Sequence, residues 1–183
     1  MQASLSFKEK ISYGLGDMAS HIAIDNVIIF LTFYYTDVVG LPAIFVGTLF
    51  LLARVADAVI DPAMGMVADR TRSRWGKFRP WLLMLAVPFG VSCMLIYAVP
   101  ENLSTTGKMV YAAVTYSLMM LMYTAINIPY CSMGAIITAD DNQRISLQSW
   151  RFFLATLGGA MSTFLMIPLA TWLGGGNKLE GYF

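Results

Sequence analysis

Five long apolar segments follow one another along the chain, separated by short polar connections. We place them at about 11–36, 43–68, 81–99, 109–138 and 147–173. Each is roughly 20 residues long or longer, the length that an α-helix needs to cross the hydrocarbon core of a bilayer. Because the connections are short, sequential helices should be antiparallel neighbours. The pattern predicts an all-α membrane protein with five transmembrane helices.

Composition agrees with this class of protein. Of the 183 residues, 57% are hydrophobic and 13% are charged, whereas soluble domains are about 45–50% apolar and about 25% charged. The basic cluster at 70–79 is a short connection between two apolar segments, so we expect no nucleic-acid partner. Cys93 and Cys131 lie in apolar segments, so we predict neither a disulfide framework nor a metal site from them.

Lysine and arginine are distributed unevenly between the two sides of the predicted membrane. Lys108 and Lys178 lie on one side, and the other side carries eight basic residues: Lys8, Lys10, Arg70, Arg72, Arg74, Lys77, Arg79 and Arg144. Cytoplasmic loops carry the excess of basic residues. The distribution therefore predicts a cytoplasmic amino terminus and an external tail.

The second apolar segment carries ionisable residues on one face. Arg54, Asp57, Asp61 and Gly65 are spaced by three, four and four residues, so they form one stripe on a helix. A charged side chain at the centre of a membrane helix costs about 2.5–3.5 kcal/mol on insertion scales. The stripe must therefore face a protein interior, an aqueous cavity or another charge, and it is the strongest functional-site hypothesis in the sequence.

A second polar row lies on the first segment, where Asp17, His21 and Asp25 are each four residues apart. Counted from the cytoplasmic ends of antiparallel helices, Asp17 is level with Asp61 and His21 with Asp57. We therefore expect the two rows to face each other, with His21 in a hydrogen-bonding or proton-exchanging role. The alternative is a salt-bridge network that only joins two helices. No second histidine or cysteine stands at ligand spacing, so a metal site at His21 is not expected.

The fourth and fifth segments add further polar candidates. Thr124 and Asn127 share a helix face, Tyr123 precedes them, and Pro129 interrupts the helix, which frees backbone carbonyls beside a cavity. Alternatively, Thr and Asn bond a neighbouring helix in lipid. Arg151 either belongs to the site or extends to lipid headgroups. In the fifth segment, small residues at four-residue spacing, such as Gly158 and Ser162, indicate close helix packing.

Several motifs together resemble the glycoside–pentoside–hexuronide:cation symporters, whose best-known member is the melibiose permease. The motifs are SYGLGD at 12–17, YYTDVVG at 34–40, the stretch 47–65, TRSRWGKFRP at 71–80, YTAINIP at 123–129 and RFF at 151–153. The resemblance extends over nearly the whole chain. It implies the major facilitator fold, with twelve helices in two six-helix halves and the site between them. Residues 1–183 would then be five helices of the amino-terminal half, with the carboxy-terminal half absent.

The resemblance also implies roles for individual residues. It implies a coupling-cation site, a sugar site, and a loop motif that helps to close the cytoplasmic side. The candidates are Asp57, Asp61 and Thr124 for the cation; Asp17, His21, Tyr123, Asn127 and Arg151 for the substrate; and Arg54, Gly65, Asp69 and Arg70 for gating or structure.

Three positions depart from the melibiose permease, which has Asp at His21 and Asn127 and Asn at Ile60. Ile60 removes an amide ligand from the cation site, so we favour a proton over sodium; apart from such a sodium ion, no metal and no cofactor are expected. Asn127 in place of a carboxylate relieves repulsion of an anionic sugar, whose carboxylate could pair with Arg151. A hexuronide is therefore favoured, with a pentoside as the alternative.

The sequence thus predicts a secondary active transporter of a bacterial inner membrane, which symports a sugar or glycoside with a cation by alternating access. Its partners would be the sugar, membrane lipid and the carboxy-terminal half of the same carrier. The alternatives are a non-transporting membrane sensor or assembly partner that retains the fold, an inactive fragment, or a facilitator for a lipid-like or drug substrate. An enzyme is not expected, because the sequence offers no nucleophile–base pair or metal ligand set.

Overall fold

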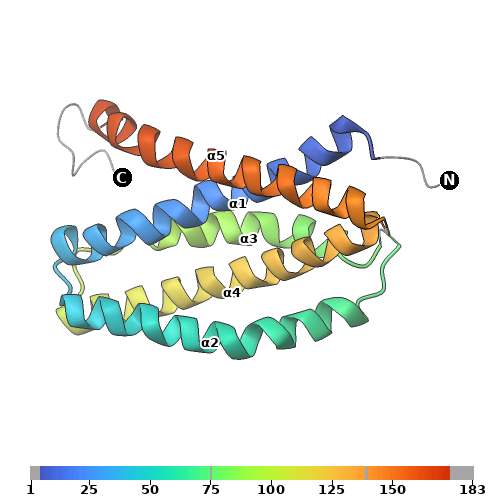
Figure 1. Cartoon of the computed structure of the whole chain (residues 1–183). Coiled ribbons are helices and arrows are strands. Elements are labelled where there is room, and N and C mark those ends of the chain that lie inside the picture. Colours follow the sequence, from blue (N-terminus) through green and yellow to red (C-terminus); the bar gives the residue numbers. More distant parts are fainter. Residues whose placement is uncertain (1–4, 75, 139, 174–183) are drawn as a thin grey trace. The chain divides into compact units, whose positions relative to one another are not determined.

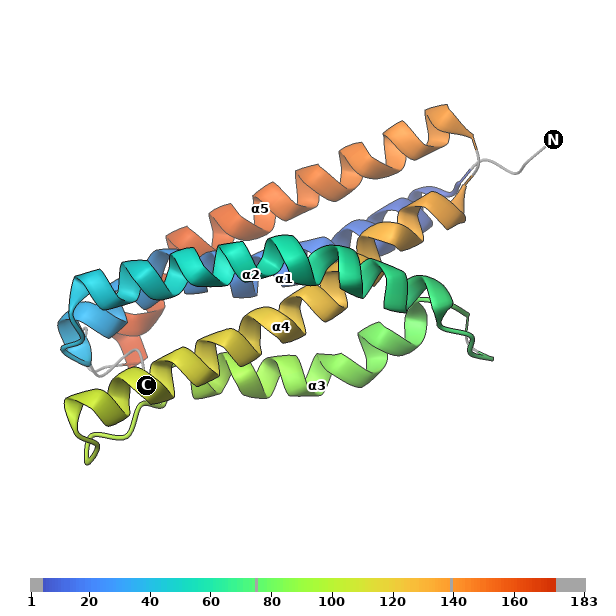
Figure 2. The same cartoon turned by 90° about the horizontal axis from the view of Figure 1, so that it is seen from below.

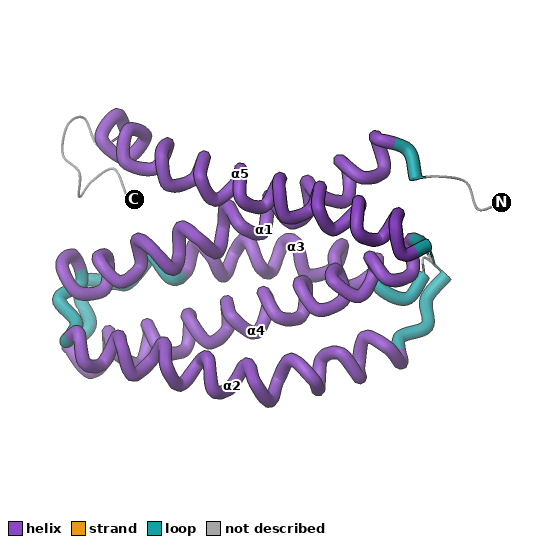
Figure 3. The backbone as a smooth tube through the Cα atoms, in the orientation of Figure 1, coloured by secondary structure: helices purple, strands orange, loops and turns teal. Residues whose placement is uncertain are grey.

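The computed structural model describes residues 5–74, 76–138 and 140–173, and all the regular structure in these ranges is helical (Figures 1 and 3). Trp75, part of the 71–80 motif, and the tail 174–183 with Lys178 lie outside the described residues. The elements in the described ranges are α1 (Phe7–Phe33), η1 (Tyr34–Val38), α2 (Ala43–Arg70), α3 (Arg79–Leu95), α4 (Thr105–Ile137) and α5 (Asp141–Leu173).

The helices correspond to the five predicted segments, but four boundaries differ by four residues or more: the starts of α1, α4 and α5 and the end of α3. α5 begins at Asp141, well before the predicted 147, because Asp140 caps it: the Asn142 N–H donates to Asp140 Oδ1 at 2.9 Å. α3 ends at Leu95, before the predicted 99. Beyond it the chain tightens into short turns, in which the Tyr97 N–H donates to the Met94 carbonyl at 3.2 Å.

Three helical stretches within the described ranges are long and apolar enough to cross a membrane: Phe7–Val38, Ala43–Arg70 and Thr105–Ile137. α3 is apolar but has only 17 residues, fewer than the predicted segment. α5 has 33 residues, and its first part is polar, with Asp141, Arg144 and Arg151. The five predicted helices are therefore present, and α1 with η1, α2 and α4 have the length and apolar character to cross a membrane.

The chain forms two compact units, and we describe each by itself. Unit 1 comprises Met1–Leu31 with Met133–Phe183, and unit 2 comprises Thr32–Ser132. The polar row of α1 belongs to unit 1, whereas the stripe of α2 belongs to unit 2. The expectation that these two rows face each other therefore stays a prediction.

In unit 1, α1 and α5 run in the same direction and approach closely through small residues. A methyl group on Gly158 would lie 2.9 Å from the carbonyl oxygen of Met18, and one on Gly14 would lie 2.6 Å from Leu154 Cδ1. One turn beyond Gly158, the Ser162 hydroxyl donates to the Ile22 carbonyl at 3.4 Å. These contacts confirm that Gly158 and Ser162 are packing residues, as their spacing indicated.

In unit 2, α4 packs against both α2 and α3 (Figure 2). The rings of Phe50 on α2 and Tyr116 on α4 are 4.8 Å apart. The Tyr111 hydroxyl donates to the Leu95 carbonyl at 3.0 Å, which joins α4 to the end of α3. The Tyr34 hydroxyl of η1 donates to the Tyr97 carbonyl just beyond α3.

Candidate functional site

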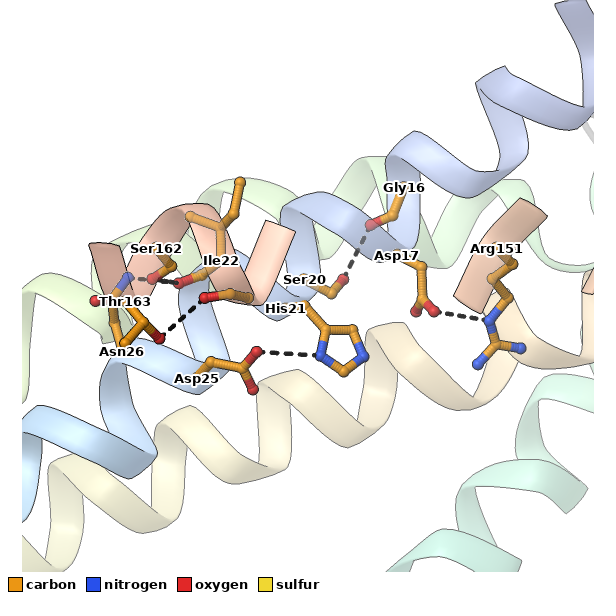
Figure 4. A network of polar contacts seen from close by, with 11 residues as sticks. Gly16, Asp17, Ser20, His21, Ile22, Asp25, Asn26, Arg151, Ser162 and Thr163 are labelled. Carbon is orange, nitrogen blue, oxygen red and sulfur yellow. Dashed lines mark hydrogen bonds and ion pairs between the residues drawn. The ribbon is translucent and has the colours of Figure 1, made fainter. Parts of the chain in front are cut away.

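An ion pair between α1 and α5 dominates the polar row of unit 1 (Figure 4). Arg151 Nε donates to Asp17 Oδ2 at 2.8 Å, and the two side chains are 14% and 4% exposed. Arg151 Nη1 also donates to Gln148 Oε1 at 3.3 Å. The sequence placed Asp17 and Arg151 among the substrate residues but did not predict their pairing or the role of Gln148. For Gln148, the available signal was its three-residue spacing from Arg151.

His21 and Asp25 form a second, looser pair along the same row. His21 Nδ1 lies 3.4 Å from Asp25 Oδ2, and the two side chains are 38% and 28% exposed. The Asp25 carboxylate lies directly against Gly159 of α5, where any larger residue would displace it. Figure 4 shows His21 and Asp25 next to Asp17 along α1. Unit 1 therefore brings three predicted polar residues of α1 into one row, with Arg151 joined to it from α5.

A pocket of about 410 Å³ lies along the same turns of α5 as Arg151 but on another face of the helix, lined by Ser146, Ser149, Trp150 and Phe153. Lys10 Nζ donates to Ser146 Oγ at 2.9 Å, and the Phe7 ring packs edge-on against Trp150 at 5.2 Å. None of the predicted site residues lines this pocket. It is therefore separate from the candidate sugar residues of unit 1.

The stripe of α2 in unit 2 lies on one continuous helix, so its members share a face as the spacing predicted. Arg54 Nη1 lies 3.6 Å from Asp57 Oδ2, and the two side chains are 55% and 16% exposed. Asp61, one turn further on, is half-buried. The stripe thus holds two carboxylates and one guanidinium, with the guanidinium the most exposed of the three groups.

Thr124 of α4 lies at the level of Asp61 within unit 2. A methyl group on Gly65 would lie 3.9 Å from Ile128 Cγ2, so Gly65 and Ile128 are at one level of the two helices. Phe50 and Tyr116 meet nearer the start of both helices, so the two contacts together show that α2 and α4 run in the same direction. Stepping back one turn from the Gly65–Ile128 contact brings Asp61 level with Thr124, whose side chain is buried. The three cation candidates therefore belong to one compact unit.

The two other α4 candidates have contacts within unit 2. Asn127 is half-buried, and its Oδ1 accepts a hydrogen bond from Cys131 Sγ at 3.6 Å. Tyr123 packs against Phe89 of α3, with ring centroids 6.3 Å apart. Pro129 lies inside α4 and provides no N–H for the carbonyl one turn earlier. The substrate candidates are therefore divided between the two units: Asp17, His21 and Arg151 in unit 1, and Tyr123 and Asn127 in unit 2.

Two of the gating candidates, Asp69 and Arg70, lie in the last turn of α2, at the end that the sequence predicts to be cytoplasmic. Asp69 forms an ion pair with Lys77, with 2.8 Å between Asp69 Oδ1 and Lys77 Nζ. Arg70 is the last residue of the helix and is exposed. Trp81 Nε1 donates to Thr71 Oγ1 at 3.0 Å, which ties the start of α3 to the end of α2. The 71–80 connection is thus fixed at both ends within unit 2, with Lys77 as a partner that the sequence did not single out.

Three symporters or transporters align with almost the whole of this chain. The inner membrane symporter YicJ of Escherichia coli (strain K12) is 62% identical over 178 residues, 97% of this chain and 38% of YicJ. YagG of the same strain, provisionally named a glycoside/cation symporter, is 50% identical over 98% of this chain and 39% of YagG. The isoprimeverose transporter of Lactiplantibacillus pentosus is 42% identical over 97% of this chain and 37% of that protein. The chain thus spans somewhat more than a third of the length of these relatives.

A match to a known protein family covers nearly all of the chain. Residues 12–183 match the family described as MFS/sugar transport protein, which is a family of transporters and not of enzymes. The resemblance found in the motifs is therefore confirmed, together with the all-helical membrane fold. The chain belongs to the MFS/sugar transport protein family of the major facilitators, among the glycoside–pentoside–hexuronide:cation symporters.

Proposed function

We propose that the complete carrier symports a sugar or glycoside with a cation by alternating access. The observation that carries this proposal is the α2 stripe in a chain of this family: Asp57 and Asp61 share a face inside a membrane helix, and Thr124 lies level with Asp61. Ionisable groups inside a membrane helix are costly and mark ion pathways or binding sites. Since the chain spans about 38% of YicJ, the activity is proposed for the complete protein.

The coupling ion in this proposal is a proton. Sodium requires several oxygen ligands, and Ile60, beside Asp61, has no side-chain oxygen to contribute. A proton needs only a carboxylate, and α2 offers two on one face, Asp57 and Asp61. Sodium, held by Asp57, Asp61 and Thr124, is the alternative.

The substrate class is open between a hexuronide and a pentoside. The sequence favours a hexuronide through Asn127 and Arg151, and the name of one relative, the isoprimeverose transporter, supports a neutral sugar or glycoside. The residue that distinguishes these classes is Arg151, because its guanidinium could pair with a sugar carboxylate. We place the carrier in a bacterial inner membrane, as the name of YicJ supports, with its amino terminus in the cytoplasm.

Uptake into right-side-out membrane vesicles of the complete carrier tests this function. A pulse of transported sugar should alkalinise the external medium, and sodium should leave the apparent affinity for sugar unchanged. Strong stimulation by sodium without proton movement would show that the coupling ion is wrong. Absence of sugar binding and of sugar uptake, in a protein that is correctly inserted, would favour a non-transporting sensor or assembly partner instead.

A further inference from the structure

The guanidinium of Arg151 already has a carboxylate partner in unit 1. Asp17 Oδ2 receives the Nε–H of Arg151 at 2.8 Å, and both side chains are largely withdrawn from solvent. The pair joins α1 to α5 across 134 residues of sequence. A substrate that approaches Arg151 therefore meets a neutral ion pair and not an isolated positive charge.

The rest of the row contains His21 and a second carboxylate, Asp25. Asp25 lies one turn from His21, and its carboxylate is held between His21 and Gly159. The row of α1 therefore adds a second carboxylate, Asp25, beside the one that already pairs with Arg151. A sugar carboxylate would enter against this charge and would share the guanidinium with Asp17, and crowding two desolvated carboxylates onto one cation is costly. The hydroxyl groups of a neutral sugar carry no such penalty.

We propose that Asp17 is the selectivity residue of the carrier, because it acts as the internal counter-ion of Arg151. In this role Asp17 does not bind the sugar. It fixes the guanidinium of Arg151 and cancels its charge, so that the unit 1 row selects neutral sugars over hexuronides. The inference rests on the proposed function, and it replaces the hexuronide preference derived from the sequence with a neutral pentoside or glycoside.

Binding to the purified complete carrier in nanodiscs tests the inference with two matched probes. Methyl β-xyloside and methyl β-glucuronide share a pyranose ring and differ by the carboxylate. The wild type should prefer the xyloside. Asp17→Asn should release the charge of Arg151 and shift the affinity ratio toward the glucuronide by about 10- to 100-fold, the worth of one charge-assisted hydrogen bond. The xyloside affinity should change by less than about threefold.

Asp25→Asn is the matched control, because it removes one negative charge from the same row without releasing a guanidinium. It should shift the ratio by less than about threefold. An equal shift in both variants would show a general charge effect and contradict the pair-specific role. Loss of xyloside binding in Asp17→Asn, with no gain for the glucuronide, would show that Asp17 is a sugar ligand and overturn the proposal.

Removing one partner of a buried ion pair can prevent folding, so the double variant Asp17→Asn with Arg151→Gln serves as a second test. It removes both charges, which is less destabilising than removing one, and it should keep the wild-type preference for the xyloside. A gain for the glucuronide in this variant would overturn the proposal. A wild type that binds sugars but prefers the glucuronide would contradict the selectivity alone, whereas a wild type that binds neither probe would contradict the proposed function as well.

Discussion

Single glycines set the distance between α1 and α5 in unit 1. At Gly158, the backbone of Met18 approaches so closely that a methyl group would lie 2.9 Å from its carbonyl oxygen. Backbone atoms cannot move aside as a flexible side chain can. Gly14 also meets the backbone of α5, since a methyl group there would lie 3.1 Å from the Trp150 carbonyl oxygen as well as 2.6 Å from the end of the Leu154 side chain. The close approach is what allows Arg151 on α5 to reach Asp17 on α1.

We therefore expect Gly158→Ala to destabilise the protein by about 1–3 kcal/mol, the usual cost of overpacking a close contact. Thermal unfolding of the purified protein in detergent measures this change. Gly90→Ala is the control, because Gly90 also lies inside a helix and has no neighbouring atom within 4 Å of the added methyl group. Equal stability of Gly158→Ala and Gly90→Ala would contradict the close packing of α1 and α5.

The two carboxylates of α2 should be required for coupling sugar uptake to the cation. Asp57→Asn or Asp61→Asn in the complete carrier should abolish uphill accumulation of sugar, because cation occupancy needs the negative charge. Sugar exchange across the membrane should survive in part, since sugar contacts depend mostly on hydrogen bonds. Counterflow and accumulation assays on the same vesicles separate the two activities. Normal accumulation by both variants would show that the stripe is only structural.

At the scale of helices, the contact between α2 and α4 brings the cation candidates together. Gly65 and Ile128 meet across these helices, and Phe50 and Tyr116 meet at another level. The two contacts are 15 residues apart on α2 and 12 residues apart on α4, so the level of Asp61 is taken from the nearer contact, Gly65–Ile128. Thr124 reaches the level of Asp61 only in this register.

Cross-linking tests the register directly. In a background with Cys93 and Cys131 replaced by Ala, cysteines at Gly65 and Ile128 should form a disulfide or accept a short thiol cross-linker, because the Cβ position at Gly65 is 3.9 Å from Ile128 Cγ2. Cysteines at Gly65 and Tyr116 should not cross-link, since Tyr116 packs at the level of Phe50. Cross-linking of the second pair in preference to the first would disprove the register.

At the scale of the whole molecule, the distribution of basic residues predicts the orientation in the membrane. A cysteine at Ser73, in the basic connection after α2, should react with an impermeant thiol reagent only from the cytoplasmic side. A cysteine at Thr105, at the start of α4, should react only from outside. Labelling intact cells and inverted vesicles of the same variants measures both. The reverse pattern would refute the orientation and the cytoplasmic assignment of the Asp69–Lys77 pair together.

The sequence alone determined the helical class, the five segments and the stripe on α2, because these depend on local properties. Apolar length, helical periodicity and the cost of charge in lipid act on residues that are near one another in the chain. The residues at which the helices begin and end were predicted less accurately. Asp140 extends α5 into polar residues by capping it, and tight turns end α3 early, effects that hydropathy does not register.

The tertiary structure alone decided which polar residues meet. Asp17 and Arg151 are 134 residues apart, and no spacing along the chain relates them. They pair because Gly14 and Gly158 let α1 and α5 approach until a guanidinium on one helix reaches a carboxylate on the other. Read in the sequence, Arg151 is an available positive charge. In the folded unit it is a neutralised one, because burial makes a lone charge costly and so favours the pair.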